Sequence, residues 1–315
     1  MKQNAKTIIS RLPGVRMAIH KDEAAWKVAR ILTVGASEAA SAIGFSKRKG
    51  QYALWAEKSG LIQPADLSNN KAVRRGRRLE QAVADIYCEE EGAIVVDPGR
   101  YTSLTNDDYP GLSATLDRIV VGHAQYGCSP PGLLECKTLH IGLRHDIDEG
   151  PYLDHQIQVQ AQLAVTGFFW GDLAYWCGDD WKVFHVKRDD TFIEAMQAEI
   201  TEFWWRVGHN DPPTADGTAA TWEALRQIHP NDLGKQVQLP PSLRAVDEEI
   251  AEAQKQRKFW TDRLEAGQAK IIQAIGDASG GYFAGGGPSY TYNKQARKEV
   301  VIPASTFRVL RRKEK

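Results

Sequence analysis

The sequence predicts an α/β fold in which helices flank a mixed central β-sheet, with a helical extension and a short β tail at the C-terminal end. Three observations predict it: an amphipathic helical pattern over residues 71–91, short β-rich runs at 93–96, 112–121 and 132–139, and a heptad-like apolar stripe over 243–275. With 315 residues, of which 42% are hydrophobic, the chain is long enough to bury a sizeable core.

The start of the chain predicts a short arm followed by helices. Residues 1–24 are expected to form a loosely ordered N-terminal arm, and residues 25–212 the main domain. The segment 22–44 predicts a helix, a turn at Gly35 and a second helix capped by Ser37. A further helix is expected from Tyr52 to Trp55, after a polar stretch that contains glycine.

The middle of the domain alternates helices and strands. Apolar residues recur at helical spacing from Val73 to Ile86, and Gly92 is placed to end that helix. The residues 126–132, YGCSPPG, indicate a hairpin connection between the second and third β-rich runs. The predicted order continues with a helix at 152–165, strands at 172–176 and 181–187, and a helix at 190–207.

The composition changes after Pro213. Residues 213–242 are expected to be a linker, and 243–315 a C-terminal helical extension with a β-rich basic tail. Short strands are predicted at 289–293 and 299–303. The apolar stripe predicts a coiled coil or a helical hairpin, and its members are Leu243, Val246, Ile250, Ala253, Trp260, Leu264, Ile271 and Ala274, interrupted by Arg257 and Gly267.

Composition, cysteine spacing and hydropathy disfavour several classes of protein. The 40 Lys and Arg residues balance the 40 Asp and Glu residues, so net charge neither demands nor excludes a nucleic-acid partner. The four cysteines form no CxxC pair, which disfavours a zinc ribbon and a disulfide framework. The first residues lack the apolar core of a secretory signal, and no apolar run is long enough for a membrane span, so a cytoplasmic protein is expected.

The strongest chemical pattern is Asp117 followed by Glu135-Cys136-Lys137. On a strand, the period of two places Glu135 and Lys137 on the same face of the sheet, and Asp117 on a neighbouring antiparallel strand can project toward that face. Carboxylates, together with the backbone carbonyl of Cys136, are hard oxygen ligands that suit Mg²⁺ or Mn²⁺. Such a site suits phosphodiester hydrolysis, with Lys137 orienting the attacking water or stabilising negative charge.

Each of these residues also has an ordinary structural interpretation. Acidic and basic residues alternate on the solvated face of many strands. Glu80 on the preceding helix can reach the metal site from the side, or can be a solvated glutamate in an ion pair. Gln158 can bind the attacking water or a phosphate oxygen, or can belong to a polar helix face.

Taken together, the ordered set of motifs resembles the lambda-exonuclease and YqaJ-like branch of the PD-(D/E)xK nucleases. The motifs are GRRLE at 76–80, LSATLD at 112–117, LLECK at 133–137 and HQIQVQAQLAVTG at 155–167. The resemblance covers roughly residues 25–210 and implies a restriction-endonuclease-like core. By position, it implies that Glu80, Asp117 and Glu135 are metal-site carboxylates, that Lys137 is the catalytic lysine and that Gln158 is the helix glutamine. One departure is Thr115-Leu116, where the family often has Pro or Ser just before the motif aspartate.

The same resemblance extends to phosphate binding. In RILTVGASEAASAIG, Arg30 and Ser37 resemble the family's arginine and serine that grip the DNA 5′-phosphate. A serine near a helix N-terminus and a bidentate guanidinium suit a terminal phosphate, although an N-cap serine and a surface arginine are the ordinary alternative. The basic residues of the 71–91 helix, which include Arg74, Arg75, Arg77 and Arg78, can track phosphates along a duplex or can simply form a solvated face of the helix.

The resemblance therefore implies a Mg²⁺-dependent exonuclease that digests double-stranded DNA ends 5′→3′ and supplies single strands to an annealing protein in phage-type recombination. It also implies a homo-oligomer in the form of a ring that encircles DNA. Two alternatives remain open: an endonuclease with restriction or junction-resolving activity, and a non-catalytic DNA-binding or assembly protein. For the C-terminal extension, self-association, docking of the annealing protein and folding back on the core all remain open.

Overall fold

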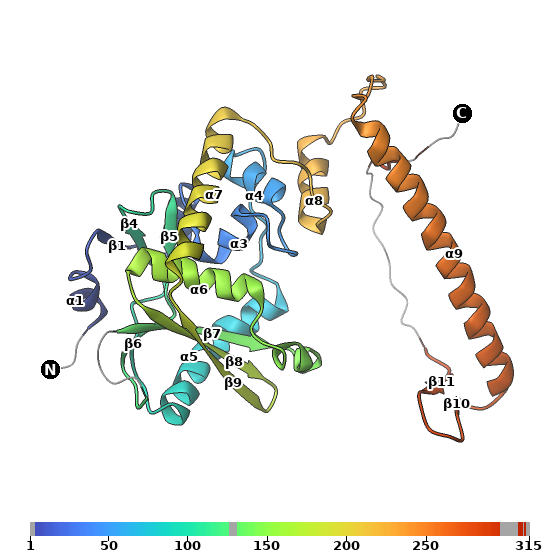
Figure 1. Cartoon of the computed structure of the whole chain (residues 1–315), viewed down its shortest axis with the longest axis horizontal. Helices are drawn as coiled ribbons and strands as arrows, with labels where there is room; N and C mark the ends of the chain where they lie inside the picture. Colours follow the sequence, from blue (N-terminus) through green and yellow to red (C-terminus); the bar gives the residue numbers. More distant parts are fainter. Residues whose placement is uncertain (1–3, 126–130, 297–307, 311, 313–315) are drawn as a thin grey trace. The chain divides into compact units, whose positions relative to one another are not determined.

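The computed structural model describes residues 4–125, 131–296, 308–310 and 312. The chain divides into two compact units, Met1–His229 and Pro230–Lys315. Helices α1 to α8 and the two larger sheets belong to the first unit (Figure 1). None of the helices in the described ranges combines the length and the hydropathy that a bilayer crossing needs.

A mixed five-stranded sheet forms the centre of the first unit. Its order is β3-β6-β7-β8-β9, in which β7 and β8 run parallel and the other neighbours run antiparallel. This sheet confirms the predicted fold class. Its strands are β3 (Ile94–Val96), β6 (Arg118–Gly122), β7 (Gly132–Leu139), β8 (Trp170–Cys177) and β9 (Asp180–Lys187).

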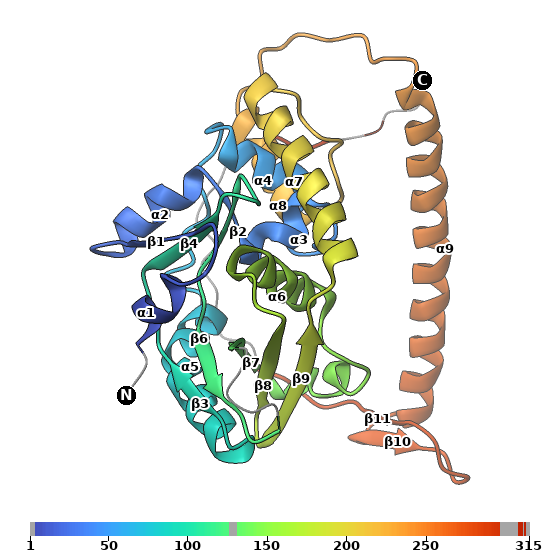
Figure 2. The ribbon, with the colours of Figure 1, turned by 60° about the vertical axis from the view of Figure 1, so that its left-hand side comes forward.

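Helices cover both faces of this sheet. Helix α5 (Lys71–Glu90) packs on one face, where Leu134 of β7 joins its core. Helix α6 (Leu153–Thr166) packs on the opposite face and contributes to a second core, which contains Leu133 (Figure 2). Because side chains alternate along a strand, Glu135 shares the α6 face with Leu133.

The predicted strand at 112–121 is in fact two strands in different sheets. Strand β5 (Leu112–Ala114) belongs to a four-stranded sheet, β6 to the five-stranded sheet, and Asp117 lies between them. The alternation of apolar and polar residues runs from Leu112 to Asp117 without interruption, so it does not mark the break after Ala114. The other strands of the smaller sheet are β1 (Val15–Ile19), β4 (Thr102–Asn106) and β2 (Val34–Gly35).

The N-terminal segment is more ordered than the sequence predicts. Strand β1 pairs antiparallel with β4, and the short helix α1 (Ala5–Ile9) buries Ile8 and Ile9 in the core. The pairing explains the order, because β1 obtains its backbone hydrogen bonds from a strand that lies far away in the sequence.

Short helices follow and build one wall of the site. They are α2 (Glu23–Ile31), the 3₁₀ turn η1 (Ala36–Glu38), α3 (Ala39–Ala42) and α4 (Gln51–Lys58). The predicted cap residue Ser37 lies inside η1, whose N-cap is Gly35, and the Gly35 N–H donates to the Glu38 carboxylate at 3.0 Å.

The first unit extends beyond the predicted domain end at 212. Helix α7 (Asp190–His209) is followed by α8 (Ala219–Ile228), which falls inside the predicted linker. The Thr218 side chain caps α8, and α8 packs against α4. Buried Ala224 ties this helix to the core, a contact that the linker-like composition of 213–222 conceals.

The second unit consists of α9 (Leu243–Ile275) and a hairpin of β10 (Gly280–Tyr282) with β11 (Ser289–Thr291). The predicted stripe coincides with α9, which is one continuous helix and not a helical hairpin. The strand predicted at 299–303 and most of the hairpin connection predicted at 126–132 lie outside the described residues.

Candidate functional site

Three chemical groups meet where β7 passes α6. Lys137 Nζ donates to Glu135 Oε1 at 2.7 Å and to Gln158 Oε1 of α6 at 2.9 Å. The predicted placement of Glu135 and Lys137 on one face of the strand is therefore what the structure has, and Gln158 joins them from the facing helix.

The Glu135 carboxylate is bound on both oxygens. Gln158 Nε2 donates to Oε1 at 2.6 Å, and Gln162 Nε2 donates to Oε2 at 2.7 Å. Glu135 is only 4% exposed, so these donors replace water around a carboxylate that would otherwise be costly to bury. Its orientation is consequently fixed by two amides one helical turn apart.

Asp117 reaches the same place from the junction between β5 and β6. The Cys136 N–H donates to Asp117 Oδ2 at 2.8 Å, which ties the carboxylate to the middle of β7. Burial, and then the nearby charges of Glu135 and Glu80, raise the pKa of Asp117 well above its ordinary value. Desolvated carboxylates that repel one another are a frequent property of functional sites.

Glu80 approaches from α5 but is engaged elsewhere. Its Oε1 accepts from Arg118 Nη1 at 2.9 Å, and the same guanidinium donates to the Asp117 carbonyl and to Gln81 Oε1. Arg118 is almost fully buried. It therefore links the helix carboxylate to the backbone of Asp117.

The donor chemistry of this cluster fits a divalent cation. Asp117 and Glu135 offer carboxylate oxygens, and the pKa of Asp117 is raised first by burial and then by neighbouring carboxylates, whose negative charge a cation would offset. Within the described ranges, however, no three Asp, Glu, His or Cys side chains surround a common point as metal ligands, because Glu135 is turned to Lys137 and Glu80 to Arg118.

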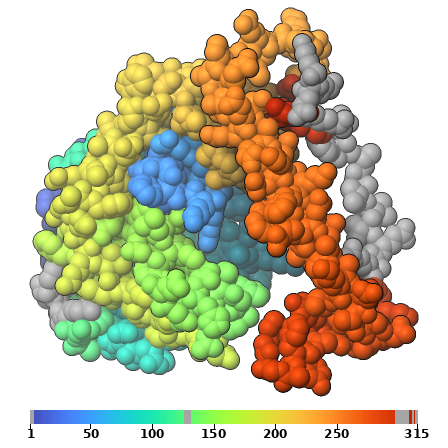
Figure 3. All heavy atoms as spheres, turned by 45° about the vertical axis from the view of Figure 1, so that its right-hand side comes forward, coloured from blue at the N-terminus to red at the C-terminus, as the bar shows by residue number. Residues whose placement is uncertain are grey.

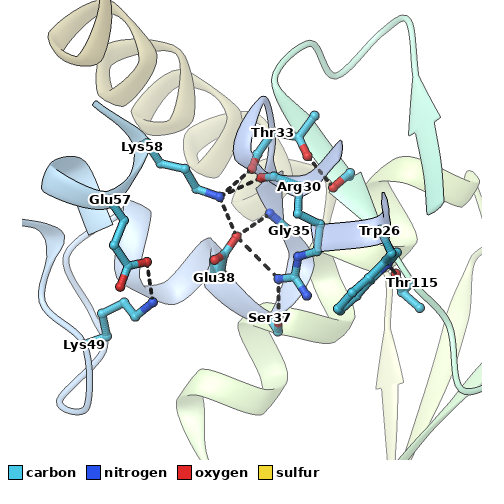
Figure 4. Close-up of polar contacts among 11 residues, drawn as sticks. Trp26, Arg30, Thr33, Gly35, Ser37, Glu38, Lys49, Glu57, Lys58 and Thr115 are labelled. Atoms are coloured by element: carbon cyan, nitrogen blue, oxygen red, sulfur yellow. Dashed lines mark hydrogen bonds and ion pairs between the residues drawn. The ribbon is translucent and has the colours of Figure 1, made fainter. Parts of the chain in front are cut away.

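A second group of residues lies at the start of the domain (Figure 4). Arg30 Nη2 donates to Ser37 Oγ at 3.0 Å, and its guanidinium lies over the Trp26 ring, 4.7 Å from the ring centroid. Trp26 Nε1 in turn donates to Thr115 Oγ1 at 3.3 Å. Arg30 and Ser37 are thus brought together, as the sequence predicts.

A partly buried ion pair between Glu38 and Lys58 supports Arg30. The Glu38 carboxylate lies 3.4 Å from Arg30 Nη2 and accepts from Lys58 Nζ at 2.9 Å. Lys58 also donates to the Arg30 and Thr33 carbonyls, each at 2.8 Å. Burial disfavours the charged carboxylate of Glu38 and raises its pKa. The positive charges of Arg30 and Lys58 have a larger combined effect, so the pKa of Glu38 lies below its ordinary value.

Both groups line the same cavity. It has a volume of about 180 Å³, and Arg30 and Ser37 face it together with Asp117, Glu135 and Gln158. A guanidinium and a hydroxyl group therefore line the same space as the carboxylates.

A separate hollow of about 400 Å³ lies along α5, and its lining is basic. Arg74, Arg75 and Arg78 face it with Lys71, at spacings of three and four residues that share one side of a helix. Arg77 is placed apart, because its Nη2 donates to Glu23 Oε1 at 3.0 Å. Of the four predicted arginines, three are thus brought together.

Comparison with known proteins agrees with the motifs. Residues 25–169 match the model of the YqaJ-like viral recombinase domain, a range that contains the carboxylate cluster, Arg30 and Ser37. Over this range the chain is similar to that recombinase domain. This similarity confirms the resemblance found in the motifs.

The chain is also similar to individual proteins. The uncharacterized protein YqaJ of Bacillus subtilis (strain 168) is 28% identical over 255 residues, which cover 76% of each chain. Among solved structures, an alkaline exonuclease from Laribacter hongkongensis is 24% identical, with a TM-score of 0.48 over 59% of this chain and 93% of that chain. A phage related exonuclease from Haemophilus somnus 129PT is 11% identical, with a TM-score of 0.41 over 57% and 96% of the two chains.

Several residues of this site are missed by the sequence reasoning. Gln162 follows Gln158 by four positions, so helical periodicity alone would have placed both amides on one side of α6. Lys58 and Glu38 carry no local signal, because their pairing depends on the packing of α4 against η1 and α3. Trp26 and Arg118 likewise meet their partners only in the folded chain.

Proposed function

We propose that the chain is a metal-dependent exonuclease that digests double-stranded DNA 5′→3′ from its ends. The observation that carries this proposal is the shared cavity, in which Arg30 and Ser37 face Asp117 and Glu135. A site that holds a terminal phosphate beside a hydrolytic cluster acts on the nucleotide at the end of a strand. Binding of the 5′-phosphate sets the polarity.

The terminal phosphate is bound by groups that are already ordered. Arg30 is supported by the Trp26 ring and by Glu38, and Ser37 Oγ lies 3.0 Å from its guanidinium. A guanidinium offers paired N–H donors to phosphate oxygens, and little side-chain entropy is lost when it is preorganised. The 5′-phosphate thereby positions the first phosphodiester bond toward the carboxylates.

Hydrolysis requires a cation at the carboxylates. Mg²⁺, or Mn²⁺ in its place, supplies Lewis acidity and neutralises charge on the phosphate when bound. Asp117 and Glu135 would hold it, with the Cys136 carbonyl and with Glu80 once its carboxylate leaves Arg118. Lys137, held by Glu135 and Gln158, orients the attacking water or stabilises the negative charge that develops on the phosphate oxygens.

The duplex beyond the end is proposed to follow α5. The hollow lined by Lys71, Arg74, Arg75 and Arg78 offers cations to successive phosphates, and its affinity would fall as salt rises. Arg77, predicted to share this role, is paired with Glu23 and would contribute less.

The biological setting is proposed from the similarity to the recombinase domain. Single strands left by the exonuclease would pass to a single-strand annealing protein during phage-type homologous recombination, in the cytoplasm of a bacterial host. A homo-oligomeric ring around the DNA would keep the enzyme on its substrate.

End-labelled duplexes test the proposed activity. With Mg²⁺, a linear duplex with 5′-phosphates is expected to be digested at least ten times faster than the same duplex with 5′-hydroxyls. A closed circle is expected to stay intact. Cutting of the circle would instead favour an endonuclease, and binding without digestion would favour a non-catalytic protein.

A further inference from the structure

Helix α9 exposes an apolar stripe along its whole length. Its 33 residues span about 50 Å at 1.5 Å per residue, and none of its side chains is buried in the part of the chain that the structure describes. Ile250 is 40% exposed, Trp260 60% and Leu264 61%. Helix α9 is drawn in orange in Figure 3. A contiguous apolar stripe of this size indicates an interaction surface.

The stripe has the spacing of a two-stranded coiled coil. Beginning at Leu243, its members alternate steps of three and four residues without a break up to Ala274. Strict alternation of this kind gives a narrow seam with a period of 3.5 residues. The first position of each heptad (a) is Leu243, Ile250, Arg257, Leu264 or Ile271, and the fourth (d) is Val246, Ala253, Trp260, Gly267 or Ala274.

A parallel pair of two α9 helices would place each residue against its own copy. Arg257 would then face Arg257 inside the seam, which costs free energy because two like charges lose water together. Gly267, Ala253 and Ala274 would each face their own copy, leaving three layers whose small residues fill the seam poorly. The sequence of the stripe therefore disfavours a parallel pair.

An antiparallel pair with full overlap has complementary layers. Its two-fold axis lies between positions 258 and 259, near the middle of α9, and it pairs each a position with a d position of the second copy. Large residues then meet small ones in three of the five kinds of layer. The layers are Leu243 with Ala274, Val246 with Ile271, Ile250 with Gly267, Leu264 with Ala253, and Arg257 with Trp260.

The central layers explain the two residues that interrupt the stripe. Arg257 of one copy lies beside Trp260 of the other, and a guanidinium over an indole ring is a favourable cation–π pair. Trp260 already has Arg263 of its own chain 5.5 Å from its ring centroid. Gly267 leaves room for Ile250 of the second copy. Neither residue interrupts the antiparallel seam.

Charges flanking the seam agree with the same register. Glu249 and Lys270 both occupy the g position, immediately before an a residue, and in the antiparallel pair Glu249 of one copy lies beside Lys270 of the other. Within one helix they are 21 positions apart, or about 31 Å, so they cannot pair within the chain. In a parallel pair Glu249 would meet the neutral Gln254.

We infer that two copies of this chain associate through α9 as an antiparallel coiled coil. The association is independent of the nuclease activity proposed above, and it joins two recombinase-like domains whatever contacts those domains make themselves.

Cysteine cross-linking of the full chain tests the direction of the pair. The double variant Ile250→Cys, Gly267→Cys is expected to form a disulfide-linked dimer on mild oxidation, whereas either single variant stays at the level of the parent chain. Efficient cross-linking by Ile250→Cys alone would establish a parallel pair and overturn the inference.

A charge exchange tests the register without any cross-link. Glu249→Lys is expected to weaken association about tenfold, since two attractive pairs become repulsive, and the double variant Glu249→Lys, Lys270→Glu is expected to restore it. Light scattering over a concentration series measures the mass of the assembly. The inference is overturned if the double variant associates as weakly as the single one, or if Leu264→Asp leaves the mass unchanged.

Discussion

Gln162 Nε2 of α6 donates to Glu135 Oε2 of β7 at 2.7 Å. The Gln162 side chain is completely buried and its Nε2 also donates to the Thr115 carbonyl at 3.1 Å, so one amide joins the carboxylate to the segment that precedes Asp117. Groups that orient a metal-binding carboxylate commonly change metal affinity when they are removed.

Gln162→Leu is therefore expected to weaken activation by Mg²⁺. The concentration of Mg²⁺ that gives half-maximal digestion should rise 10- to 100-fold, because Glu135 loses one of the donors that fix its orientation. Gln156→Leu is the matched control, since Gln156 lies on the same helix and donates to the Pro151 carbonyl, away from the site. Equal Mg²⁺ requirements for both variants would contradict a role for Gln162 in positioning Glu135.

Glu38→Gln is expected to impair recognition of the terminal phosphate. The neutral amide keeps the shape of the side chain but leaves buried Lys58 without its counter-charge and Arg30 without its support, at a cost of roughly 3–5 kcal/mol in the free energy of unfolding. KM for 5′-phosphorylated ends should rise about tenfold or more, while KM for 5′-hydroxyl ends should stay the same.

Glu57→Gln is the control for that experiment, because Glu57 pairs with Lys49 and does not touch Arg30. Steady-state kinetics on both substrates, with thermal unfolding of each variant, separates loss of recognition from loss of fold. A proportional rise in KM for both kinds of end would show that Glu38 acts on stability alone.

Neutralising the basic hollow is expected to lower the salt dependence of duplex binding. Arg74→Gln and Arg78→Gln should each reduce the slope of log K against log salt concentration by about 1, as expected when one phosphate contact is lost. Arg77→Gln should change the slope less, since Arg77 is engaged by Glu23. Fluorescence anisotropy in Ca²⁺, over a salt series, measures the slopes, and three identical slopes would argue against a DNA path along α5.

Acid is expected to destabilise the fold through His155. Burial first, and then the charges of Lys137 and Arg48, lower the pKa of His155 to about 2, so its ring stays neutral in the folded chain at moderately acidic pH. In the unfolded chain the ring takes up a proton below a pH of about 6.5, and folding stability from this group is therefore lost as pH falls from 6.5 toward 2. Between pH 7 and pH 5 the loss is roughly 2 kcal/mol.

Urea unfolding of His155→Gln at both pH values measures this contribution. The glutamine can still bond to the Tyr175 hydroxyl, which lies 2.7 Å from His155 Nδ1. Between pH 7 and pH 5, the free energy of unfolding of the variant should fall by about 2 kcal/mol less than that of the parent chain. His145→Gln, at an exposed ring, should leave the difference unchanged.

The sequence predicts the residues that carry the chemistry of the site better than it predicts the residues that hold them in place. Glu135 and Lys137 share a face because a strand has a period of two, and this rule needs no tertiary information. The break before Asp117 is hidden, since the alternation of apolar and polar residues continues from Leu112 to Asp117 across the end of β5. The Glu38–Lys58 pair is hidden for another reason: it forms only when α4 and the η1 turn are packed together.

The same difference between local and long-range signals separates α9 from β1 and α8. Heptad spacing predicts the extent of α9 to the residue, because local periodicity determines a long helix. By contrast, β1 and α8 lie in segments whose composition is typical of an arm and a linker, and they are ordered by contacts with β4 and α4. Long-range pairing of this kind leaves no local trace in the sequence.

The central claim is that Asp117 and Glu135 act on a phosphodiester bond through a shared cation, and Asp117→Asn tests it most directly. Asparagine keeps an oxygen that can accept the Cys136 N–H but removes a charge that burial and its neighbours disfavour. Mg²⁺-dependent digestion of a 5′-phosphorylated duplex is expected to fall about 100- to 1,000-fold, as for loss of a principal electrostatic group, with an unfolding temperature equal to or above that of the parent chain. Full digestion by a well-folded Asp117→Asn variant would contradict the claim.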